Sequence, residues 1–390
     1  MYLPRTAADT LEGLAHGYPV IVVTGPRQSG KTTLVRKVFG SKPYVSLETP
    51  DQRRFAQEDP RRFLARYPDG AVLDEAQRCP ELLSYLQAVV DEDGRTGLFI
   101  LTGSQQFGLM AGISQSLAGR VALVPLLPFS LAELQAGGRA PATVDQLLTT
   151  GLYPPVHDRG LDPGVWYGNY VNTYLERDVR ALLNVRDLGT FQRFLGLCAG
   201  RTGQLVNTAA LANQCGITHN TAKAWLSVLE AGYLVHLLKP HHRNFNKRLV
   251  KTPKLYFLDV GLAASLLGIQ DAHMMTLHPL RGALFETWVV SELLKSRFNR
   301  GKRSNLFFWR DRSGNEMDLI LERGRELVPV EIKSGATVNR DYFKGMDRWE
   351  ALSGDTETPK WVVYGGMDRQ SRGQTEVLPW TELGELDHLL

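Results

Sequence analysis

The stretch Val20-Ile-Val-Val-Thr24, followed directly by Gly25-Pro-Arg-Gln-Ser-Gly-Lys-Thr32, decides the fold of the first part of this chain. The first five residues favour a buried strand, and a helix is expected to begin near Thr32. Between them, two glycines let backbone N–H groups curl around a phosphate, and the following helix adds the positive end of its dipole. Strand, loop and helix in this order predict a nucleotide-binding α/β domain.

The loop residues are expected to bind ATP and Mg²⁺. Lys31 would neutralise phosphate charge, and the Thr32 hydroxyl would be a ligand of Mg²⁺. The alternative is a glycine-rich turn without a ligand. The predicted nucleotide-binding residues of the loop are Gly25, Pro26, Arg27, Gln28, Ser29, Gly30, Lys31, Thr32 and Thr33.

A second motif, Ala71-Val-Leu-Asp74-Glu75, places two carboxylates at the end of a buried strand. We expect Asp74 to hold Mg²⁺ through water and Glu75 to polarise the attacking water, a role that ATP hydrolysis needs and nucleotide storage does not. The same pair could instead be an exposed turn or a helix cap. Because it follows a phosphate-binding loop, hydrolysis is the prediction, with Lys31 and Glu75 as catalytic residues.

Composition places the chain among folded globular proteins. Its 390 residues are 43% hydrophobic and 22% charged, which argues against long disorder or coiled coil, and the length predicts two or three domains. The cysteines Cys79, Cys198 and Cys215 are far apart and predict buried thiols rather than disulfides or a zinc site. Without a signal-like start or a long apolar run, the expectation is a cytoplasmic protein with no membrane span.

Hydrophobic patterning divides the chain into three regions. Up to about Gly138, short β-branched runs alternate with helical stretches, which predicts a parallel sheet covered on both faces. From about Ala140 to Leu280 the pattern is mostly helical. From about Arg281 a helix and further strand-like runs predict a second α/β unit. The predicted strands are Val20 to Val23, Tyr44 to Leu47, Ala71 to Leu73, Leu98 to Leu101, Val121 to Val124, Leu306 to Trp309, Met317 to Glu322 and Leu327 to Ile332.

The segment Leu205 to Ala231 fits a helix, a turn at Gly216 and a second helix capped by Thr218. The exposed start of that second helix is where a recognition helix meets DNA, and it carries His219, Asn220 and Lys223. A hairpin, Tyr233 to Leu238 with Lys254 to Leu258, would complete a winged helix. The alternative is a helical packing module with no ligand.

Basic residues concentrate inside that hairpin. Lys239 to Lys254 holds six Lys or Arg, two His and no acid, which points to a polyanion and makes DNA the predicted partner. Phe245, among these cations, could stack on a base or sugar. The alternative is a solvated charge run. The residues predicted to contact nucleic acid here are Arg243, Lys247 and Arg248.

Two further segments have the spacing of the PD-(D/E)xK nuclease core, namely Asn315-Glu-Met-Asp318 and Val328-Pro-Val-Glu331-Ile-Lys333. In that core, Asp318 and Glu331 would bind a divalent metal and Lys333 would steady the nucleophile or the phosphate, making Glu331 and Lys333 catalytic. Glu286, in an apolar helix, would supply an earlier acid and needs a partner or a metal. Since such a scaffold can bind DNA without cutting it, nuclease activity stays open.

The three regions together resemble a widespread family of bacterial and archaeal ATPases, in which an AAA+-like domain precedes a C-terminal domain of unknown function. The resemblance implies an α/β fold made of a P-loop core (1–138), a helical lid (139–200), a winged-helix region (201–280) and a restriction-endonuclease-like domain (281–390). The stretches that carry it are Gly25 to Thr33, Leu73-Asp-Glu-Ala-Gln77, Leu101-Thr-Gly-Ser104, Leu117-Ala-Gly-Arg120, Tyr174-Leu-Glu-Arg-Asp178, Phe285-Glu-Thr287 and Val330-Glu-Ile-Lys-Ser334.

By analogy with AAA+ ATPases, a polar side chain after the strand Phe99 to Leu101 senses the γ-phosphate. Ser104 is the predicted residue, with Thr102 as one alternative and an ordinary strand-end cap without contact to nucleotide as the other. Arg120, or else Arg177, would act as an arginine finger on the nucleotide of a neighbouring subunit, although a surface arginine explains Arg120 equally well. This role requires a homo-oligomer, with a hexamer as one candidate.

Three functions fit these features. The leading hypothesis is an ATP-driven machine that binds or remodels DNA, with forked or four-way junctions as candidate substrates and a nuclease-like domain that grips or cuts DNA. The second is a nucleotide-controlled switch or scaffold that recruits protein partners. The third is a metal nuclease that ATP regulates. Stimulation of ATP turnover by DNA would separate the first from the second.

Overall fold

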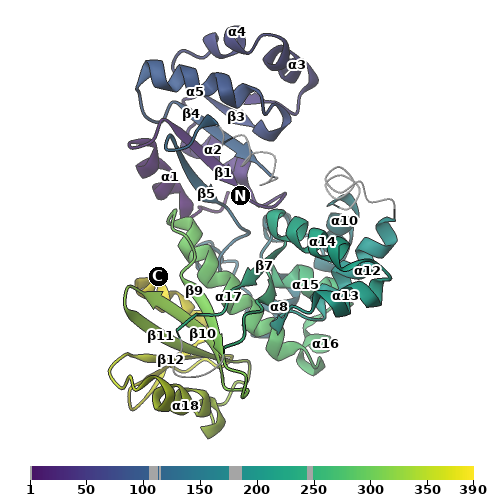
Figure 1. Ribbon diagram of the computed structural model, residues 1–390, viewed down its shortest axis with the longest axis vertical. Helices are drawn as coiled ribbons and strands as arrows, with labels where there is room; N and C mark the ends of the chain where they lie inside the picture. Colours follow the sequence, from purple (N-terminus) through teal and green to yellow (C-terminus); the bar gives the residue numbers. More distant parts are fainter. Residues whose placement is uncertain (1, 105–112, 114–115, 175–186, 244–248) are drawn as a thin grey trace. The chain divides into compact units, whose positions relative to one another are not determined.

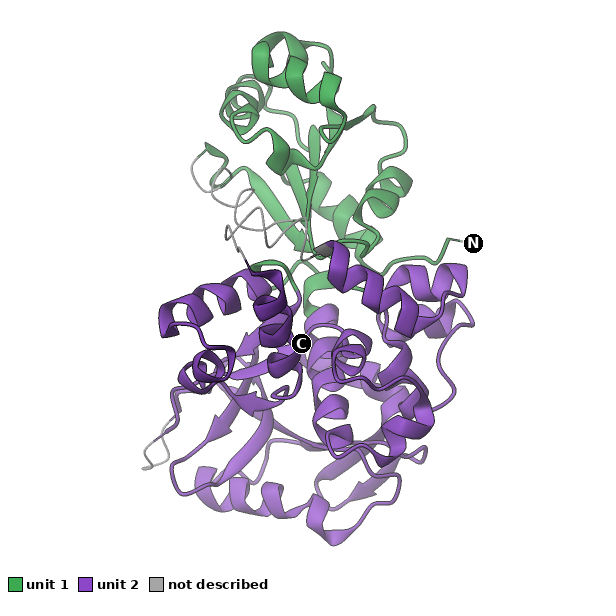
Figure 2. Ribbon diagram, turned by 90° about the vertical axis from the view of Figure 1, so that its right-hand side faces the viewer, with its two compact units in different colours: residues 1–129, 231–233, 297–303 green, residues 130–230, 234–296, 304–390 purple. Residues whose placement is uncertain are grey.

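The structure is a computed structural model that describes residues 2–104, 113, 116–174, 187–243 and 249–390. It divides into two compact units (Figure 2). Unit 1 contains residues 1–129, 231–233 and 297–303, and unit 2 contains residues 130–230, 234–296 and 304–390. The finer boundaries expected at 138, 200 and 280 remain predictions.

Unit 1 is built on a five-stranded parallel sheet (Figure 1). The strand order is β2-β3-β4-β1-β5, so the strand that leads into the glycine loop lies between β4 and β5. All five strands were predicted from their β-branched runs, and the parallel arrangement is confirmed. The strands are β1 Val20–Thr24, β2 Tyr44–Ser46, β3 Ala71–Asp74, β4 Phe99–Gly103 and β5 Val121–Pro125.

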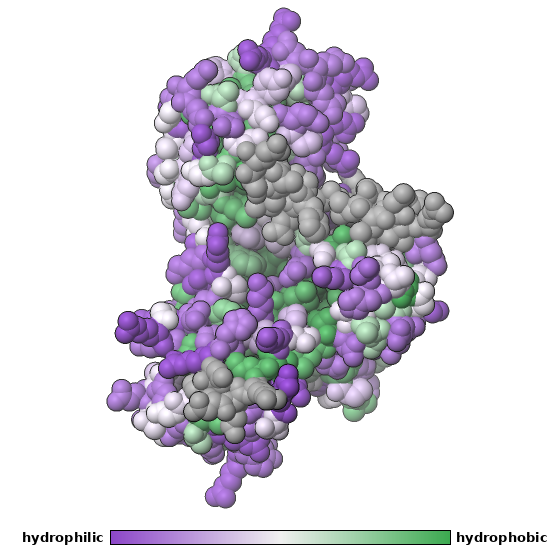
Figure 3. Space-filling view, in the orientation of Figure 1, coloured by the Kyte–Doolittle hydropathy of each residue, from purple (hydrophilic) through white to green (hydrophobic). Residues whose placement is uncertain are grey.

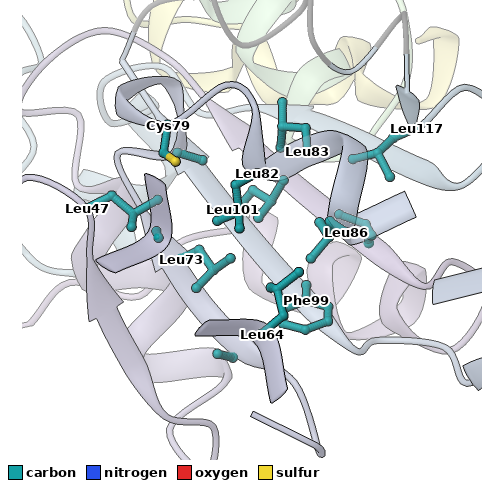
Figure 4. Packing of buried hydrophobic residues seen from close by; sticks show 14 of the residues in the cluster. Leu47, Leu64, Leu73, Cys79, Leu82, Leu83, Leu86, Phe99, Leu101 and Leu117 are labelled. Atoms are coloured by element: carbon teal, nitrogen blue, oxygen red, sulfur yellow. The ribbon is translucent and has the colours of Figure 1, made fainter. Parts of the chain in front are cut away.

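Both faces of this sheet are buried, which explains why its strands are apolar throughout rather than alternating. Val20 and Val22 belong to one apolar cluster, whereas Ile21 and Val23 belong to another. Figure 4 shows the first cluster, in which Leu82 and Leu86 of α5 pack near Leu101. The helices of unit 1 are α1 Ala7–Ala15, α2 Lys31–Val38, α3 Pro50–Glu58, α4 Pro60–Ala65, η1 Ala76–Arg78 and α5 Leu82–Asp93.

Unit 2 begins with helices and a small antiparallel sheet. The predicted helix, turn and helix form as α13 and α14, with Gly216 left-handed between them, and the predicted hairpin forms as β7 and β8. A short strand β6 pairs with the other side of β8. These elements are α7 Leu131–Ala136, α8 Val144–Thr150, α9 Pro154–Arg159, α10 Pro163–Tyr174, α12 Leu188–Ala199, β6 Gln204–Leu205, α13 Thr208–Cys215, α14 His219–Ala231, β7 Val235–Leu238, β8 Lys254–Phe257, α15 Val260–Leu266, α16 Ala272–Leu277 and α17 Arg281–Asn299.

The C-terminal part of unit 2 is a six-stranded mixed sheet in the order β13-β14-β12-β11-β10-β9. Antiparallel pairs join β9, β10 and β11, and parallel pairs join β11, β12 and β14. Helix α18 packs Met346 and Trp349 against this sheet. Its elements are β9 Leu306–Arg310, β10 Glu316–Arg323, β11 Glu326–Lys333, η3 Arg340–Tyr342, α18 Lys344–Ser353, β12 Lys360–Tyr364, β13 Gln370–Arg372, β14 Thr375–Pro379 and η4 Trp380–Leu389.

The structure bears on two expectations from composition, the state of the cysteines and the presence of a membrane-spanning helix. Cys79, Cys198 and Cys215 are buried free thiols, as predicted, and burial raises the pKa of Cys198 to about 12. Among the described helices, none combines the length and apolar character needed to cross a membrane.

Candidate nucleotide site and a buried charged cluster

The loop between β1 and α2 has the backbone that its glycines permit. Gly25 and Gly30 have φ angles of 143° and 93°. A Cβ atom on Gly25 would lie 2.1 Å from the carbonyl oxygen of Leu126, so the loop requires glycine there for space as well as for conformation. Helix α2 begins at Lys31, next to Thr32 where a helix start was expected.

Lys31 turns back over this loop. Its Nζ donates hydrogen bonds to the carbonyl oxygens of Pro26, at 2.7 Å, and Gly25, at 3.0 Å, and the side chain is buried. The positive charge of Lys31 is therefore fixed on the loop that is expected to hold phosphate.

Thr32 and Asp74 meet at the carboxyl end of the sheet. The Thr32 hydroxyl lies 3.1 Å and 3.2 Å from the two carboxylate oxygens of Asp74. Hydroxyl and carboxylate oxygens are the ligands that Mg²⁺ prefers, directly or through water, so these two residues fit the predicted metal. The structure thus brings together the two predicted Mg²⁺ residues of the nucleotide site.

Two other hydroxyls also contact Asp74. Tyr44, at the start of the neighbouring strand β2, donates to Asp74 Oδ2 at 2.6 Å, and Thr102 on β4 donates to Oδ1. Burial, followed by the hydrogen bond to Asp74, raises the pKa of Tyr44 above its ordinary range. Tyr44 was not among the predicted site residues; its place at the start of a predicted strand was the available signal.

Glu75 is held away from a regular conformation. Its φ and ψ of 57° and 44° are left-handed, which is uncommon outside glycine. Gln77 Nε2 donates to its carboxylate, and the Ser104 hydroxyl lies 3.4 Å from the same oxygen, Oε2. Thr102 Oγ1 accepts from the Glu75 backbone N–H at 3.3 Å. Ser104 therefore adjoins the predicted catalytic carboxylate, and Gln77 is a neighbour that we did not predict.

The candidate arginine finger Arg120 pairs within its own chain. Its guanidinium donates to Asp91 on α5, with Nη2 2.8 Å from Oδ2, and this hydrogen bond lowers the pKa of Asp91. Arg120 remains partly exposed, with a side-chain exposure of 33%. The alternative residue, Arg177, lies outside the described residues.

Arg5 is a third residue beside the candidate nucleotide site that we did not predict, after Tyr44 and Gln77. The side chain is 6% exposed, and its guanidinium donates to the carbonyl oxygens of Ser29 and Leu127, both at 2.7 Å. It also lies 4.9 Å from the ring centroid of Phe129. Arg5 thereby ties the phosphate loop to the segment after β5.

On α14 the predicted DNA-facing residues are exposed, whereas Trp225 on the same helix is buried against Phe191 and Phe194. Thr218 Oγ1 accepts from the Thr221 N–H at 3.1 Å, as expected of the helix cap. Arg243 is exposed as well. The residues left exposed on α14 are His219, Asn220 and Lys223. Phe245, Lys247 and Arg248 lie outside the described residues.

The two ends of the basic segment pair with the edge strand β9. On the first side, the His241 N–H donates to the Phe308 oxygen at 2.7 Å, and the Phe308 N–H donates to the Lys239 oxygen at 3.2 Å. On the second, the Val250 N–H donates to the Arg310 oxygen at 3.0 Å. The segment is therefore anchored to the C-terminal sheet at both ends.

The C-terminal residues predicted from the nuclease pattern form a cluster of charges. Lys333 Nζ lies 2.6 Å from Glu331 Oε1 and 3.7 Å from Asp318 Oδ2, so the predicted common face of Glu331 and Lys333 is confirmed. Asp318 Oδ2 also accepts from the Ile332 N–H at 2.9 Å. Burial, with the Asp318 carboxylate as the next cause, raises the pKa of Glu331 to about 7.

Glu286 has protein partners in the same cluster. Lys254 Nζ, from β8, lies 3.0 Å from its Oε1, and the Tyr256 hydroxyl donates to the same oxygen at 2.5 Å. Burial raises the pKa of Glu286, although the Lys254 charge opposes that rise. Within the described ranges, no three His, Cys, Asp or Glu side chains are grouped so that they could hold a metal ion. The metal role of Glu286, Asp318 and Glu331 stays a prediction that this arrangement does not favour.

Comparison with known families places residues 17–135 in a model described as "AAA domain". With the loop geometry above, this defines the chain as one that carries an AAA-type P-loop ATPase domain. Residues 142–273 and 281–383 match two families described as "Domain of unknown function", DUF8612 and DUF4143.

Two curated mycobacterial proteins are similar to most of the chain. They are Uncharacterized protein Rv2008c of Mycobacterium tuberculosis and Uncharacterized protein Mb2031c of Mycobacterium bovis, each 34% identical over 339 residues, which are 85% of this chain and 74% of the relative. The chain belongs to the family of these two proteins.

The solved structures that align with this chain have lower sequence identity to it than the two mycobacterial proteins have. A Walker-type ATPase of Pyrococcus abyssi aligns with 67% of this chain and 94% of its own at 17% identity and a TM-score of 0.46. DnaA of Aquifex aeolicus aligns over 57% of this chain and 85% of its own chain, at 15% identity and a TM-score of 0.30. The branch migration motor RuvB of Thermotoga maritima aligns over 59% of this chain and 88% of its own chain, at 16% identity and a TM-score of 0.27.

Proposed function

We propose that unit 1 hydrolyses ATP with Mg²⁺. The observation that carries this proposal is the contact of Thr32 Oγ1 with both oxygens of Asp74, because it joins the loop that would hold the phosphates to the strand end that would hold the metal. Lys31 would neutralise phosphate charge and Glu75 would polarise the attacking water. Thr32 and Asp74 would hold Mg²⁺, which would neutralise the charge that develops on the phosphates.

We further propose that hydrolysis is coupled to DNA binding or remodelling by unit 2, with forked and four-way junctions as candidate substrates. In this proposal α13, α14 and the β7–β8 hairpin act as a winged helix, and the exposed start of α14 meets a DNA groove. The C-terminal sheet, proposed to be nuclease-like in fold, contributes to DNA binding rather than to cutting.

Exposed basic residues near the basic segment support a phosphate-binding surface. Arg243 Nη1 lies 3.5 Å from the carbonyl oxygen of Arg325, in the turn between β10 and β11, and both side chains are exposed. Lys239 and Arg323 are also exposed. Figure 3 shows hydrophilic side chains over much of the face on which β9 to β12 and α18 lie. Such residues would neutralise DNA phosphates and make binding salt-dependent.

The proposal includes a homo-oligomer in which Arg120 acts on a neighbour's nucleotide. For this, Arg120 must leave its ion pair with Asp91. A pair at an exposed position contributes little to stability, so exchange of partners on assembly is energetically accessible.

The ATP hydrolysis rate should be measured with Mg²⁺, alone and with single-stranded, duplex, forked and four-way DNA, using Lys31→Ala as the blank. Stimulation by one DNA structure supports the coupling and identifies the substrate. A rate that is the same with every DNA contradicts it, while leaving ATP hydrolysis itself supported.

A second candidate is a nucleotide-controlled switch that recruits protein partners and hydrolyses ATP slowly. The hydrogen bond from Gln77 to Glu75 favours it, because the amide restrains the carboxylate and lowers its basicity, which would slow the activation of water. Slow turnover that no DNA stimulates would select this function.

A further inference from the structure

Lys254 reaches into the cluster of acids from outside the C-terminal sheet. It lies on β8, in the hairpin of the helical region, and its Nζ is 2.6 Å from Glu316 Oε1 and 3.0 Å from Glu286 Oε1. The side chain is only 4% exposed, and Nζ lies 5.5 Å from the ring centroid of Phe308. A lysine buried to this degree requires anionic partners, and here it has two.

The charges of the cluster are already close to balance. Its acids are Glu286, Glu316, Asp318 and Glu331, and its cations are Lys254, Lys333 and Arg310, whose Nη1 is 3.0 Å from Glu316 Oε2. A divalent ion would add two positive charges to a site that lacks at most one. It would also compete with Lys333 for Glu331 Oε1 and with the Ile332 N–H for Asp318 Oδ2. Glu331 Oε2 is buried without a hydrogen-bond partner, but one such oxygen does not make a divalent site. The residues present therefore do not fit a resident divalent metal.

We infer that the Lys254 ammonium takes the place that a divalent ion would take among these acids, so that the cluster is a metal-free charged joint. The joint binds the β7–β8 hairpin to α17 and to β10. Tyr256, two residues along the same strand, strengthens it by donating to Glu286. This inference concerns a site different from the nucleotide site, and it holds whether or not unit 1 hydrolyses ATP.

The joint also explains the anchoring of the basic segment. Lys254 is the last residue of that segment, and residues nearer both of its ends pair with the edge of the same sheet. With Lys254 fixed on Glu286 and Glu316, the register of the segment on β9 is set from its C-terminal side. A site that performs this role has to keep its lysine, because removal of one partner leaves buried carboxylates without compensation.

Binding of Mn²⁺ to the full chain tests the inference, measured by electron paramagnetic resonance and by calorimetry. Every protein carries Asp74→Asn, which removes the metal residue of the nucleotide site. We expect no Mn²⁺ binding that depends on Asp318 in this background. Lys254→Met should gain one Mn²⁺ site that the parent lacks, and the added substitution Asp318→Asn should remove that site. Lys251→Met, an exposed position in the same segment, is the matched control and should gain none.

Two results would overturn the inference. One is Mn²⁺ binding in the protein with Lys254 intact that disappears with Asp318→Asn, since the metal would then have its own place. The other is a folded Lys254→Met variant that gains no site, since the lysine would then not be standing in for a cation. If Lys254→Met does not fold, the comparison of the Asp318→Asn variant with its parent, both of which keep Lys254, still decides the first point.

Discussion

The hydroxyl of Thr32 lies 3.1 Å from Oδ1 and 3.2 Å from Oδ2 of Asp74, although the two residues are 42 positions apart in sequence. Parallel strands produce this contact, because the loop after β1 and the last residue of β3, Asp74, lie at the same edge of the sheet. The proposed phosphate loop and the carboxylate proposed to bind Mg²⁺ thus meet without any local sequence relationship.

Substitution at this contact should abolish hydrolysis. We expect Thr32→Ala and Asp74→Asn each to lower kcat for ATP by about a hundredfold or more, because each removes an oxygen that would position Mg²⁺. Steady-state phosphate release checks this. Lys37→Ala, at an exposed position of the same helix, is the control and should keep the normal rate. Retention of full activity by Asp74→Asn would disprove the assigned metal role.

Glu75 and Gln77 should have opposite effects. Glu75→Gln is expected to lower kcat by about 10²–10⁴-fold while ATP still binds, because the general base is lost and the loop is not. Gln77→Leu should raise the rate without DNA about threefold, since it releases the Glu75 carboxylate. Single-turnover hydrolysis, together with nucleotide binding measured separately, distinguishes these effects. A lowered rate in Gln77→Leu would show that Gln77 helps catalysis instead.

Arg5 should matter for both stability and nucleotide binding. Arg5→Met leaves the buried carbonyl oxygens of Ser29 and Leu127 without this donor, and we expect the free energy of unfolding to fall by about 2–4 kcal/mol. KM for ATP should rise, because the loop loses its tie to the segment after β5. Arg5→Lys should recover part of both. Urea denaturation and the KM measurement check the two effects, and an unchanged KM would restrict Arg5 to a structural role.

Stability should depend on pH through His236. Burial, with Lys239 as a smaller cause, lowers the pKa of this β7 residue to about 4, below the ordinary value of about 6.5. The folded protein keeps the ring neutral, whereas the unfolded chain takes up a proton below pH 6.5. With respect to this histidine, the free energy of unfolding is therefore highest above pH 6.5 and decreases as the pH falls toward 4. Because the side chain is only half-buried, we expect about 1–2 kcal/mol.

Urea denaturation between pH 7 and pH 4 measures that loss. His236→Gln should flatten the pH dependence by the same amount, because the glutamine side chain does not titrate. His242, an exposed histidine in the same region, offers the matched control His242→Gln, which should leave the slope as it is. An equal slope in His236→Gln and the parent would contradict the assignment.

Lys223 and Arg243 should both contribute phosphate contacts to the proposed DNA surface. Lys223→Ala on α14 and Arg243→Ala near β9 should each weaken binding and reduce the salt dependence of log Kd by about one unit. Lys37→Ala in unit 1 is the control and should change neither. Binding measured over a range of salt concentrations checks this, and unchanged slopes for both variants would remove these residues from the DNA surface.

Much of the fold was predictable because its signals are local. The runs that became β1 to β5 are apolar and bounded by turns, and Gly216 and Thr218 mark the join between α13 and α14 by their own chemistry. The pair Glu331 and Lys333 followed from strand alternation alone. Each of these features can be predicted from a few residues that are neighbours in the sequence.

The missed residues act through partners that are remote in the sequence. Lys254 meets Glu286 and Glu316 only after a hairpin, a long helix and a sheet have folded, and nothing near Lys254 identifies those partners. Arg5 likewise bonds to residues up to 123 positions away. The apolar surroundings of Glu286 predicted a partner or a metal; the folded chain supplies a lysine.

Pairing of the basic segment with β9 has a consequence for self-association. β9 is an edge strand, and the unpaired N–H and C=O groups of an edge are a template on which a strand of another molecule can add. The residues from Lys239 to His241 and at Val250 occupy such groups on Phe308 and Arg310. These residues thus shield part of this edge of the six-stranded sheet from edge-to-edge strand addition, and copies in the proposed homo-oligomer would meet through other surfaces.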